Sequence, residues 1–447
     1  MSPEIAVGWG QRGRQALRLL PRGALPAVLS RGSNAALAFL STIIIARVLV
    51  PSEYGVYSLA VSALGLLALA GQLGFDALTP RSLGIYAHDK DWPHAFSFMR
   101  WTTKVVVGAS ILAYAAATLA LTWNPMRWDP AEVLASRILL LGLPFVALLR
   151  IERSRLQAFD KTALGLFFEL PFWNTLLLAS GVLLFLVPAL RTSAALAALH
   201  ALTFAVAFLA AHLALRRQLP PRPARLEPAK VAWARHGASF TVLAVLGFLL
   251  NQGDVLLVGT FLSQEDTAHF SVAVRSAGLT LIVLQPLQQV VAPRIAKAWS
   301  RGDRAEATRL ARRCGQLSLL AGVPMALFFW LGGPFFLQLF GGEYDDALWA
   351  LRWLSLAQVL YAAAGPGSMV MQMIHEEKAS IGLVACIVGA GLPLTALLAW
   401  KYGIAGAAAA KVLTLGAASV GACVFLRVRK GIDILPWSPR PPQPTDP

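Results

Sequence analysis

LVPSEYGVYSLAVSALGL (Leu49 to Leu66) and LSQEDTAHFSVAVRSAGL (Leu262 to Leu279) are the two stretches of sequence that decide the fold. They align without gaps at an offset of 213 residues, and six of the eighteen positions are identical. Each stretch spans the turn between the first two apolar runs of one half of the chain. Because both copies run in the same direction, they predict two similar halves arranged as parallel repeats.

The composition indicates that most of the chain lies in a membrane. Of the 447 residues, 57% are hydrophobic and 14% are charged, and the mean hydropathy is +0.61. Apolar runs of roughly 20 residues, the length needed to cross about 30 Å of hydrocarbon, recur along the whole sequence. The predicted fold class is therefore all-α, a polytopic membrane protein of about twelve transmembrane helices in two six-helix lobes.

The helices can be placed on the sequence together with the segments that flank them. We predict a basic N-terminal segment (1–25), an N-lobe (26–215), a basic linker (216–236), a C-lobe (237–427) and a Pro-rich tail (428–447). The twelve predicted helices cover residues 26–50, 54–75, 98–121, 133–150, 163–188, 192–215, 237–262, 267–292, 314–339, 347–373, 378–400 and 403–427.

The formal net charge of +16 is typical either of a nucleic-acid-binding protein or of a membrane protein with basic loops on one side. About 28 of the 39 Lys and Arg residues fall in segments on the N-terminal side of the membrane, and about four fall in the opposite loops. This asymmetry follows the positive-inside rule, so we expect both termini in the cytoplasm and no nucleic-acid partner.

Several polar side chains are predicted to lie inside the membrane, where an uncompensated charge is costly. Arg31 lies roughly 8 Å into its helix, and Arg275 and Lys411 lie roughly 12 Å into theirs. The alternative is snorkelling of the long side chain back to the interface, which is equally compatible with the position of Arg137. The candidates for a substrate-binding cavity are Arg31, Asn34, Arg137, Arg275, Gln285 and Lys411.

Two acidic side chains are also predicted to be buried, and each has amide neighbours. Glu169 lies near Asn174, whereas Asn251 and Asp254 are three residues apart and so share one helix face. A buried carboxylate can take up a proton or a sodium ion, so Glu169, Asn251 and Asp254 are candidates for a coupling-ion site. A structural ion pair or an inter-helix hydrogen bond is the alternative interpretation.

No motif indicates catalysis or a cofactor. We find no nucleophile and base at motif spacing, no His cluster and no Gly-rich phosphate loop, so we do not expect an enzyme, a metal or a bound cofactor. His200 is expected to hydrogen-bond to a neighbouring side chain. The segment from Arg301 to Arg313 is expected to form a basic amphipathic helix on the membrane surface.

Four motifs in order resemble a known family. They are ARVLVPSEYGVYSLA (Ala46 to Ala60), LGFDALTPR (Leu73 to Arg81), DVLLVGTFLSQEDTAHFSVAVR (Asp254 to Arg275) and FGGEYDDALWALRWLSL (Phe340 to Leu356). The sequence resembles the polysaccharide biosynthesis and Wzx-like oligosaccharide flippases, in the superfamily of multidrug, oligosaccharidyl-lipid and polysaccharide exporters. The resemblance covers roughly residues 26–427 and implies two lobes around a central cavity that opens alternately to either side.

The resemblance also implies a cargo and a location. The cargo would be a polyprenyl-pyrophosphate-linked oligosaccharide, flipped from the inner to the outer leaflet of the bacterial cytoplasmic membrane for cell-surface polysaccharide biosynthesis. Its partners would be that lipid, membrane lipids and a polymerase or glycosyltransferases, and coupling would use a proton gradient, a sodium gradient or the membrane potential. The alternatives are a cation-coupled exporter of small drugs and a non-transporting membrane scaffold of polysaccharide assembly.

Overall fold

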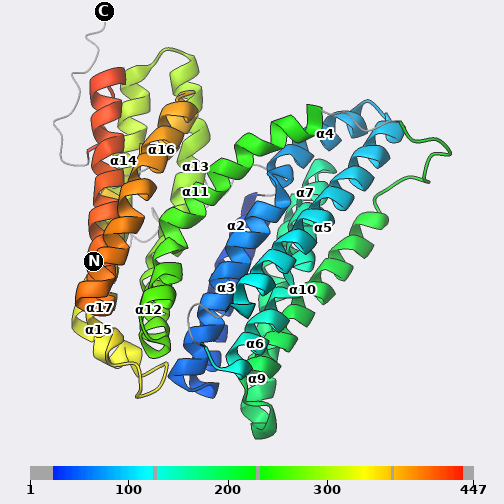
Figure 1. Ribbon diagram of the computed structural model, residues 1–447. Helices are drawn as coiled ribbons and strands as arrows, with labels where there is room; N and C mark the ends of the chain where they lie inside the picture. The colour runs from blue at the N-terminus through cyan, green and yellow to red at the C-terminus, as the bar shows by residue number, and fades with distance from the viewer. Residues whose placement is uncertain (1–23, 124–127, 228–231, 364–366, 436–447) are drawn as a thin grey trace, which may run out of the picture.

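The computed structural model describes residues 24–123, 128–227, 232–363 and 367–435, and all regular secondary structure within these ranges is helical (Figure 1). In these ranges nine helices, some of them composite, are long and apolar enough to cross a membrane. They are Pro51–His88, Trp92–Thr122, Pro130–Ala158, Thr162–Leu186, Ser193–Arg216, Ala244–Phe261, Arg304–Leu337, Ala347–Met373 and Glu377–Lys430.

Within the described residues, the first half of the chain contains α2 and five helices or composite helices that are long and apolar enough to cross a membrane. α3 and α4, α6 and α7, and the run from α8 through the π-helix η1 to α9 each form one composite pass. The elements are α2 (Ala24–Val48), α3 (Pro51–Gln72), α4 (Phe75–His88), α5 (Trp92–Thr122), α6 (Pro130–Leu140), α7 (Leu143–Ala158), α8 (Thr162–Phe167), η1 (Phe168–Phe172), α9 (Trp173–Leu186), the short turn η2 (Pro188–Leu190) and α10 (Ser193–Arg216).

In the second half of the chain, α17 reverses its direction and so forms two antiparallel arms. Gly403 has φ 62° and ψ −148°, a conformation that only glycine adopts readily, and the helix turns back there. Gly391 and Gly421 then pack against Thr414 and Leu383 of the opposite arm. The elements are α11 (Ala232–Phe261), α12 (Gln264–Ala277), α13 (Leu279–Ser300), α14 (Arg304–Leu337), α15 (Ala347–Ala363), α16 (Gly367–Met373) and α17 (Glu377–Lys430).

Several helices are longer than the sequence predicted. α5 begins at Trp92 rather than 98, and α11 begins at Ala232, inside the predicted linker. The basic segment from Arg301 to Arg313, predicted as a separate surface helix, mostly forms the first turns of α14. The apolar run that predicts a membrane helix ends where charged residues begin. The backbone hydrogen bonds of the helix can continue beyond that point into water, so the observed helix is longer.

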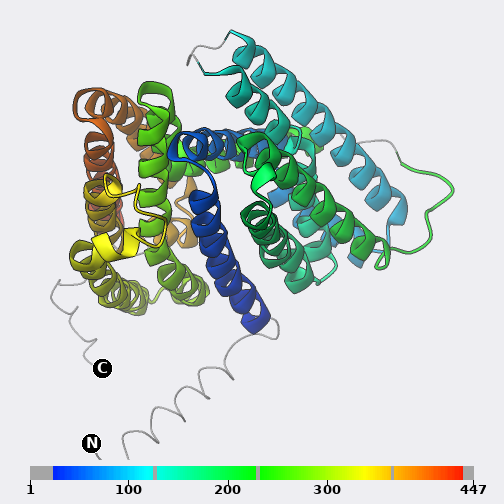
Figure 2. The same ribbon diagram turned by 90° about the horizontal axis from the view of Figure 1, so that it is seen from below.

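The two lobes meet at one end of the molecule and diverge toward the other (Figures 1 and 2). We call the end where α2 turns into α3 and α11 turns into α12 the hairpin end. The opposite end carries residues 217–227, which lead from α10 toward α11, and we call it the linker end. In Figure 1 the hairpin end is at the bottom and the lobes form a V that widens toward the linker end, where α11 crosses the opening to reach α4.

The two repeated stretches of sequence pack directly against each other where the lobes meet. α3 and α12 are in contact, and a Cβ atom added to Gly55 would overlap the Gln264 carbonyl group and lie 3.2 Å from the Ala268 backbone nitrogen. Gly55 and Ala268 are equivalent positions at the 213-residue offset. The two small residues thus let two equivalent helices approach closely, as small residues do between membrane helices.

Aromatic and polar contacts surround this close approach at the hairpin end. The Tyr344 hydroxyl donates to the Ala46 carbonyl (3.2 Å), and the Tyr344 ring packs edge-on against Tyr54 at 6.2 Å between centroids. Burial raises the pKa of the Tyr344 phenol well above its usual value, so the hydroxyl remains a donor. Gln264 Nε2 also donates to Glu132 Oε2 across the lobes (2.7 Å).

The close contact leads to a prediction for stability. We expect Gly55→Ala to lower the free energy of unfolding by about 1–3 kcal/mol, because the added methyl group must push α12 away from α3. The control is Gly108→Ala in α5, where no heavy atom outside the local helix lies within 4 Å of the new Cβ. Unfolding of the purified variants in detergent is the measurement, and equal stability of the two variants would contradict the prediction.

Candidate substrate pathway and its polar clusters

An ion pair lies in the C-lobe between α11 and α17. Lys411 Nζ is 3.2 Å from Asp254 Oδ2, and the side chains of Lys411 and Asp254 are 8% and 3% exposed. Lys411 also donates to the carbonyls of Leu250 (2.7 Å) and Asn251 (3.0 Å). The predicted cavity cation Lys411 and the predicted ion-site residue Asp254 are therefore partners, and together they add no net charge to the C-lobe.

This ion pair borders a cavity of about 380 Å³ within the C-lobe. Neither Asp254 oxygen accepts a hydrogen bond of good geometry from the described residues. Asn251, three residues before Asp254, lines the same cavity, and its side-chain Nδ2 donates to the Gly247 carbonyl (2.8 Å). The other polar lining residues are Gln252, Gln288, Gln358 and Tyr361.

A second cluster of charges lies in the N-lobe. Glu169 of η1 lies between two arginines of α7, with Arg153 Nε 3.0 Å from Oε2 and Arg150 Nε 3.6 Å from Oε1. Asp76, at the start of α4, is 3.8 Å from Arg153 Nη2. Two carboxylates and two guanidinium groups thus form one network. For Glu169 the structure shows the ion pair that was the alternative interpretation, and its role at a coupling-ion site stays a prediction.

The position of this cluster follows from a local change in helix geometry. Pro171 has no backbone N–H, and the chain adopts a five-residue π-helix, Phe168–Phe172, around it. η1 packs against both α2 and α7. One turn further on, Asn174 Nδ2 donates to Asn34 Oδ1 of α2 (2.6 Å), so the cavity candidate Asn34 is tied to α9.

The N-lobe cluster lies close to the two N-lobe helices, α2 and α4, that contact the C-lobe. α4, which carries Asp76, contacts α11, and α2, which packs on η1, contacts α13. The side chains of Arg150, Arg153, Glu169 and Asp76 are between 16% and 26% exposed. The cluster is therefore partly accessible and lies near the boundary between the lobes.

Arg275 lies at the contact between the lobes. It is on α12, and its Nη1 donates to Thr42 Oγ1 of α2 (3.3 Å). Beside it, the Tyr57 hydroxyl and His200 Nδ1 are 2.8 Å apart, which confirms that His200 is hydrogen-bonded to a neighbour. No carboxylate of the described residues forms an ion pair with Arg275, so its charge is not neutralised by the protein there.

The three other residues predicted to line a substrate cavity are Arg137, Arg31 and Gln285. Arg137 is half-buried in α6, and its buried Nε has no hydrogen-bond partner among the described residues. Arg31 lies in α2 and Gln285 lies in α13, but their side chains are outside the described part of the structure. The candidates thus fall on both lobes, and the structure does not gather them into one site.

Sequence reasoning missed Arg150 and Arg153 as site residues. Both lie near the predicted end of a helix, where basic residues usually mark the cytoplasmic interface. Their spacing of three places them on one helix face, which is the pattern that could have identified them. What the sequence could not supply is the position of Glu169, because the π-helix shifts that side chain relative to a regular helix.

Known proteins share this sequence pattern and fold. The sequence profile of the family described as "Polysaccharide biosynthesis protein" matches residues 44–348. Among curated proteins, no sequence matches the chain at a significant level.

Solved structures of the MOP superfamily have the same fold. An inward-facing multidrug resistance MATE family transporter has a TM-score of 0.71 at 15% identity, covering 91% of this chain and 98% of its own. The lipid II flippase MurJ in an inward closed conformation has a TM-score of 0.70 at 13% identity, covering 90% and 87%. A MOP superfamily transporter from Pyrococcus furiosus has a TM-score of 0.62 at 14% identity, covering 91% and 94%. These similarities establish a two-lobed, multi-pass membrane fold.

The buried ion pair in the C-lobe leads to a second prediction. Lys411→Met leaves the Asp254 charge buried without its partner, and we expect it to destabilise the protein by about 3–5 kcal/mol. The double variant Lys411→Met with Asp254→Leu removes both charges and should recover most of that loss. Thermal unfolding of the purified full chain is the measurement. A double variant as unstable as the sum of its two single variants would contradict this account.

Proposed function

This chain belongs to the polysaccharide biosynthesis protein family and has the fold of membrane transporters, and we propose that it flips a polyprenyl-pyrophosphate-linked oligosaccharide across the cytoplasmic membrane. The cargo has an anionic pyrophosphate, a polar glycan and a long apolar tail. Transport requires that the head group cross the hydrocarbon while the tail remains in the lipid.

The position of Arg275 is the observation that carries this proposal. Arg275 lies roughly 16 Å along α12 from Gln264, near half the thickness of a bilayer core. It lies between the lobes and has no carboxylate partner among the described residues. An arginine fork donates paired hydrogen bonds to phosphate oxygens, so Arg275 offers a charged contact for a pyrophosphate at mid-membrane depth.

The arrangement of the lobes supports alternating access. Two of the hydrogen bonds between the lobes, Tyr344 with Ala46 and Gln264 with Glu132, lie at the hairpin end, and α4 also contacts α11 further toward the linker end. The helices diverge toward the linker end (Figure 1). The distribution of Lys and Arg would place the linker end in the cytoplasm. In that orientation this conformation would load its cargo from the inner leaflet, and rocking of the lobes about the hairpin-end contacts would release it outside.

Cation-coupled export of small drugs is the second candidate function, and the buried carboxylates favour it. Asp254 borders a polar cavity, and its two oxygens accept no well-aligned hydrogen bond within the described chain. Binding of a proton or sodium ion by Asp254 would weaken its attraction for Lys411. Glu169 is less suited to this role, because two arginines already neutralise it.

Neutralisation of Arg275 distinguishes the candidate functions. In cells that lack the gene, we expect labelled polyprenyl-linked oligosaccharide to accumulate in the inner leaflet, and the intact gene to restore its delivery. Arg275→Gln should reduce delivery by about tenfold or more, because one charge-assisted contact to phosphate is worth roughly 1.5–3 kcal/mol. Arg275→Lys should retain part of the activity, since the charge remains.

Arg301→Gln is the matched control, because Arg301 is exposed at the turn between α13 and α14. Normal outside delivery in the deletion strain would refute the flippase proposal. Loss of cation-driven drug uptake into vesicles by Asp254→Asn, with glycolipid delivery unchanged by Arg275→Gln, would establish the exporter instead. Full function with Arg31, Arg275 and Lys411 all neutralised would favour the scaffold.

A further inference from the structure

A cavity of about 710 Å³ lies at the linker end of the N-lobe. Helices α5, α7 and α10 and the segment 217–227 form its walls. In both views α5, α10 and this segment lie on the side of the N-lobe away from the C-lobe (Figures 1 and 2). The cavity is therefore separate from the polar clusters described above, and the proposed transport pathway does not use it.

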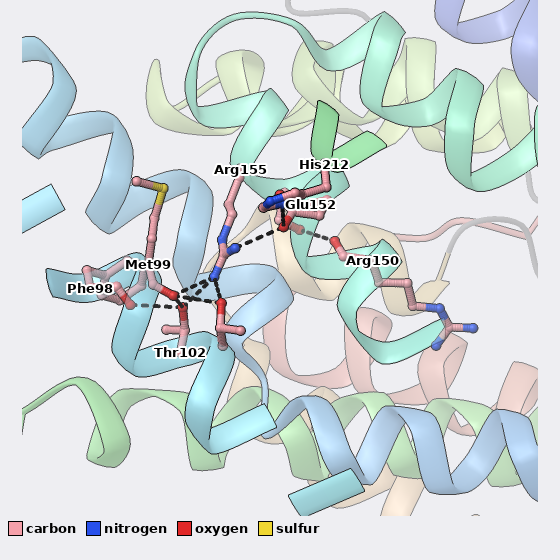
Figure 3. A network of polar contacts seen from close by, with 9 residues as sticks. Phe98, Met99, Thr102, Arg150, Glu152, Arg155 and His212 are labelled. Carbon is pink, nitrogen blue, oxygen red and sulfur yellow. Dashed lines mark hydrogen bonds and ion pairs between the residues drawn. The ribbon is translucent and has the colours of Figure 1, made fainter. Parts of the chain in front are cut away.

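The floor of the cavity is a buried arginine held in a fixed position. Arg155 is 4% exposed and donates through Nη2 to the Met99 carbonyl (2.7 Å) and to the hydroxyls of Thr102 (3.0 Å) and Thr103 (2.7 Å). Its Nη1 is 3.0 Å from Glu152 Oε1, and a dashed line marks this ion pair in Figure 3. A further donor of the guanidinium, Nε, is buried without a partner among the described residues.

The single carboxylate in this network pairs with Arg155 and His212 through Oε1, and its Oε2 is buried without a hydrogen-bond partner among the described residues. Glu152 is 1% exposed, and its Oε1 is also 3.0 Å from His212 Nδ1, so Arg155 and His212 point toward it from α7 and α10 (Figure 3). Glu152 therefore offsets the charge of Arg155 and leaves nothing to offset the other cations of the cavity.

The walls of the cavity carry four further cations. No described carboxylate forms an ion pair with any of them, and all four are exposed: Arg100 and Lys104 on α5, Arg216 at the end of α10, and Arg222 in the following segment. Arg100 and Lys104 are one helical turn apart, so their side chains project from the same face of α5. The cavity thus concentrates positive charge around an opening to the surface.

Apolar side chains complete the cavity beside these cations. They are Phe96, Met99, Leu215, Leu219, Pro220 and Leu226. A site that combines four unneutralised cations with an apolar wall, at the end of membrane-spanning helices, is complementary to an amphiphile with an anionic head group. A free inorganic anion would use only the charged half of it.

We propose that this cavity binds the phosphate head group of an anionic membrane lipid in the leaflet at the linker end. The phosphate is contacted by Arg100, Lys104, Arg216 and Arg222. Arg155 holds in place the part of α5 that carries Arg100 and Lys104, because it hydrogen-bonds to α5 between and beside them. The apolar wall contacts the upper part of the acyl chains. A bound lipid would join α5 and α10 to the segment 217–227, which leads into the C-lobe.

The test compares two triple variants of the full chain with the same change in charge. The first, Arg100→Gln, Lys104→Gln and Arg222→Gln, removes three cavity cations that are exposed and are not needed for packing. The control, Arg301→Gln, Arg427→Gln and Arg429→Gln, removes three exposed cations elsewhere at the linker end. Phosphatidylglycerol binding to the purified proteins is titrated in detergent by native mass spectrometry, with phosphatidylcholine and inorganic phosphate as the comparison probes.

We expect the unmodified chain and the control to retain one tightly bound phosphatidylglycerol, and the cavity variant to bind it about tenfold more weakly or worse. Equal losses in the two variants would show only diffuse attraction to basic loops and would overturn the proposal. Equal binding of phosphatidylcholine, or displacement of phosphatidylglycerol by inorganic phosphate at matched concentration, would also overturn it, because neither result requires an anionic lipid.

Discussion

The contact between α3 and α12 is the constraint on which the arrangement of the two lobes depends. Gly55 lies against the backbone of Gln264 and Ala268, and no side chain fits between them. Lipid chains are as apolar as the helix surfaces, so membrane helices associate through close packing and hydrogen bonds rather than through the hydrophobic effect. A glycine at this position lets the lobes meet closely at the hairpin end.

The low dielectric inside the lobes explains how the buried charges are arranged. Lys411 is paired with Asp254, and Glu169 is held between two arginines, because an isolated charge at such positions would be too costly. Arg275 differs in having only the Thr42 hydroxyl as a partner in the described chain. Among the cations without a carboxylate partner, we propose anionic ligands for Arg275 between the lobes and for the four cations of the linker-end cavity.

The sequence determined the class of protein well, but it did not indicate which polar residues lie together. Twelve apolar runs of spanning length predicted twelve passes, since the hydrocarbon thickness fixes the length of a helix that crosses it. Helix ends were less accurate, as at α11 and α14, because helices extend into water beyond their apolar part. Lys411 and Asp254 were each identified as buried and functional candidates, but the sequence did not indicate that they pair.

The sequence by itself determined the two-lobed membrane architecture, because the 213-residue repeat and the spacing of apolar runs are properties of the chain alone. Only the tertiary structure decided which charges neutralise one another. That outcome depends on distances of about 3 Å between side chains far apart in sequence, such as Lys411 and Asp254, and on the π-helix that shifts Glu169. Coulomb energy in a low dielectric falls steeply on this scale, so a hydropathy pattern carries no information about it.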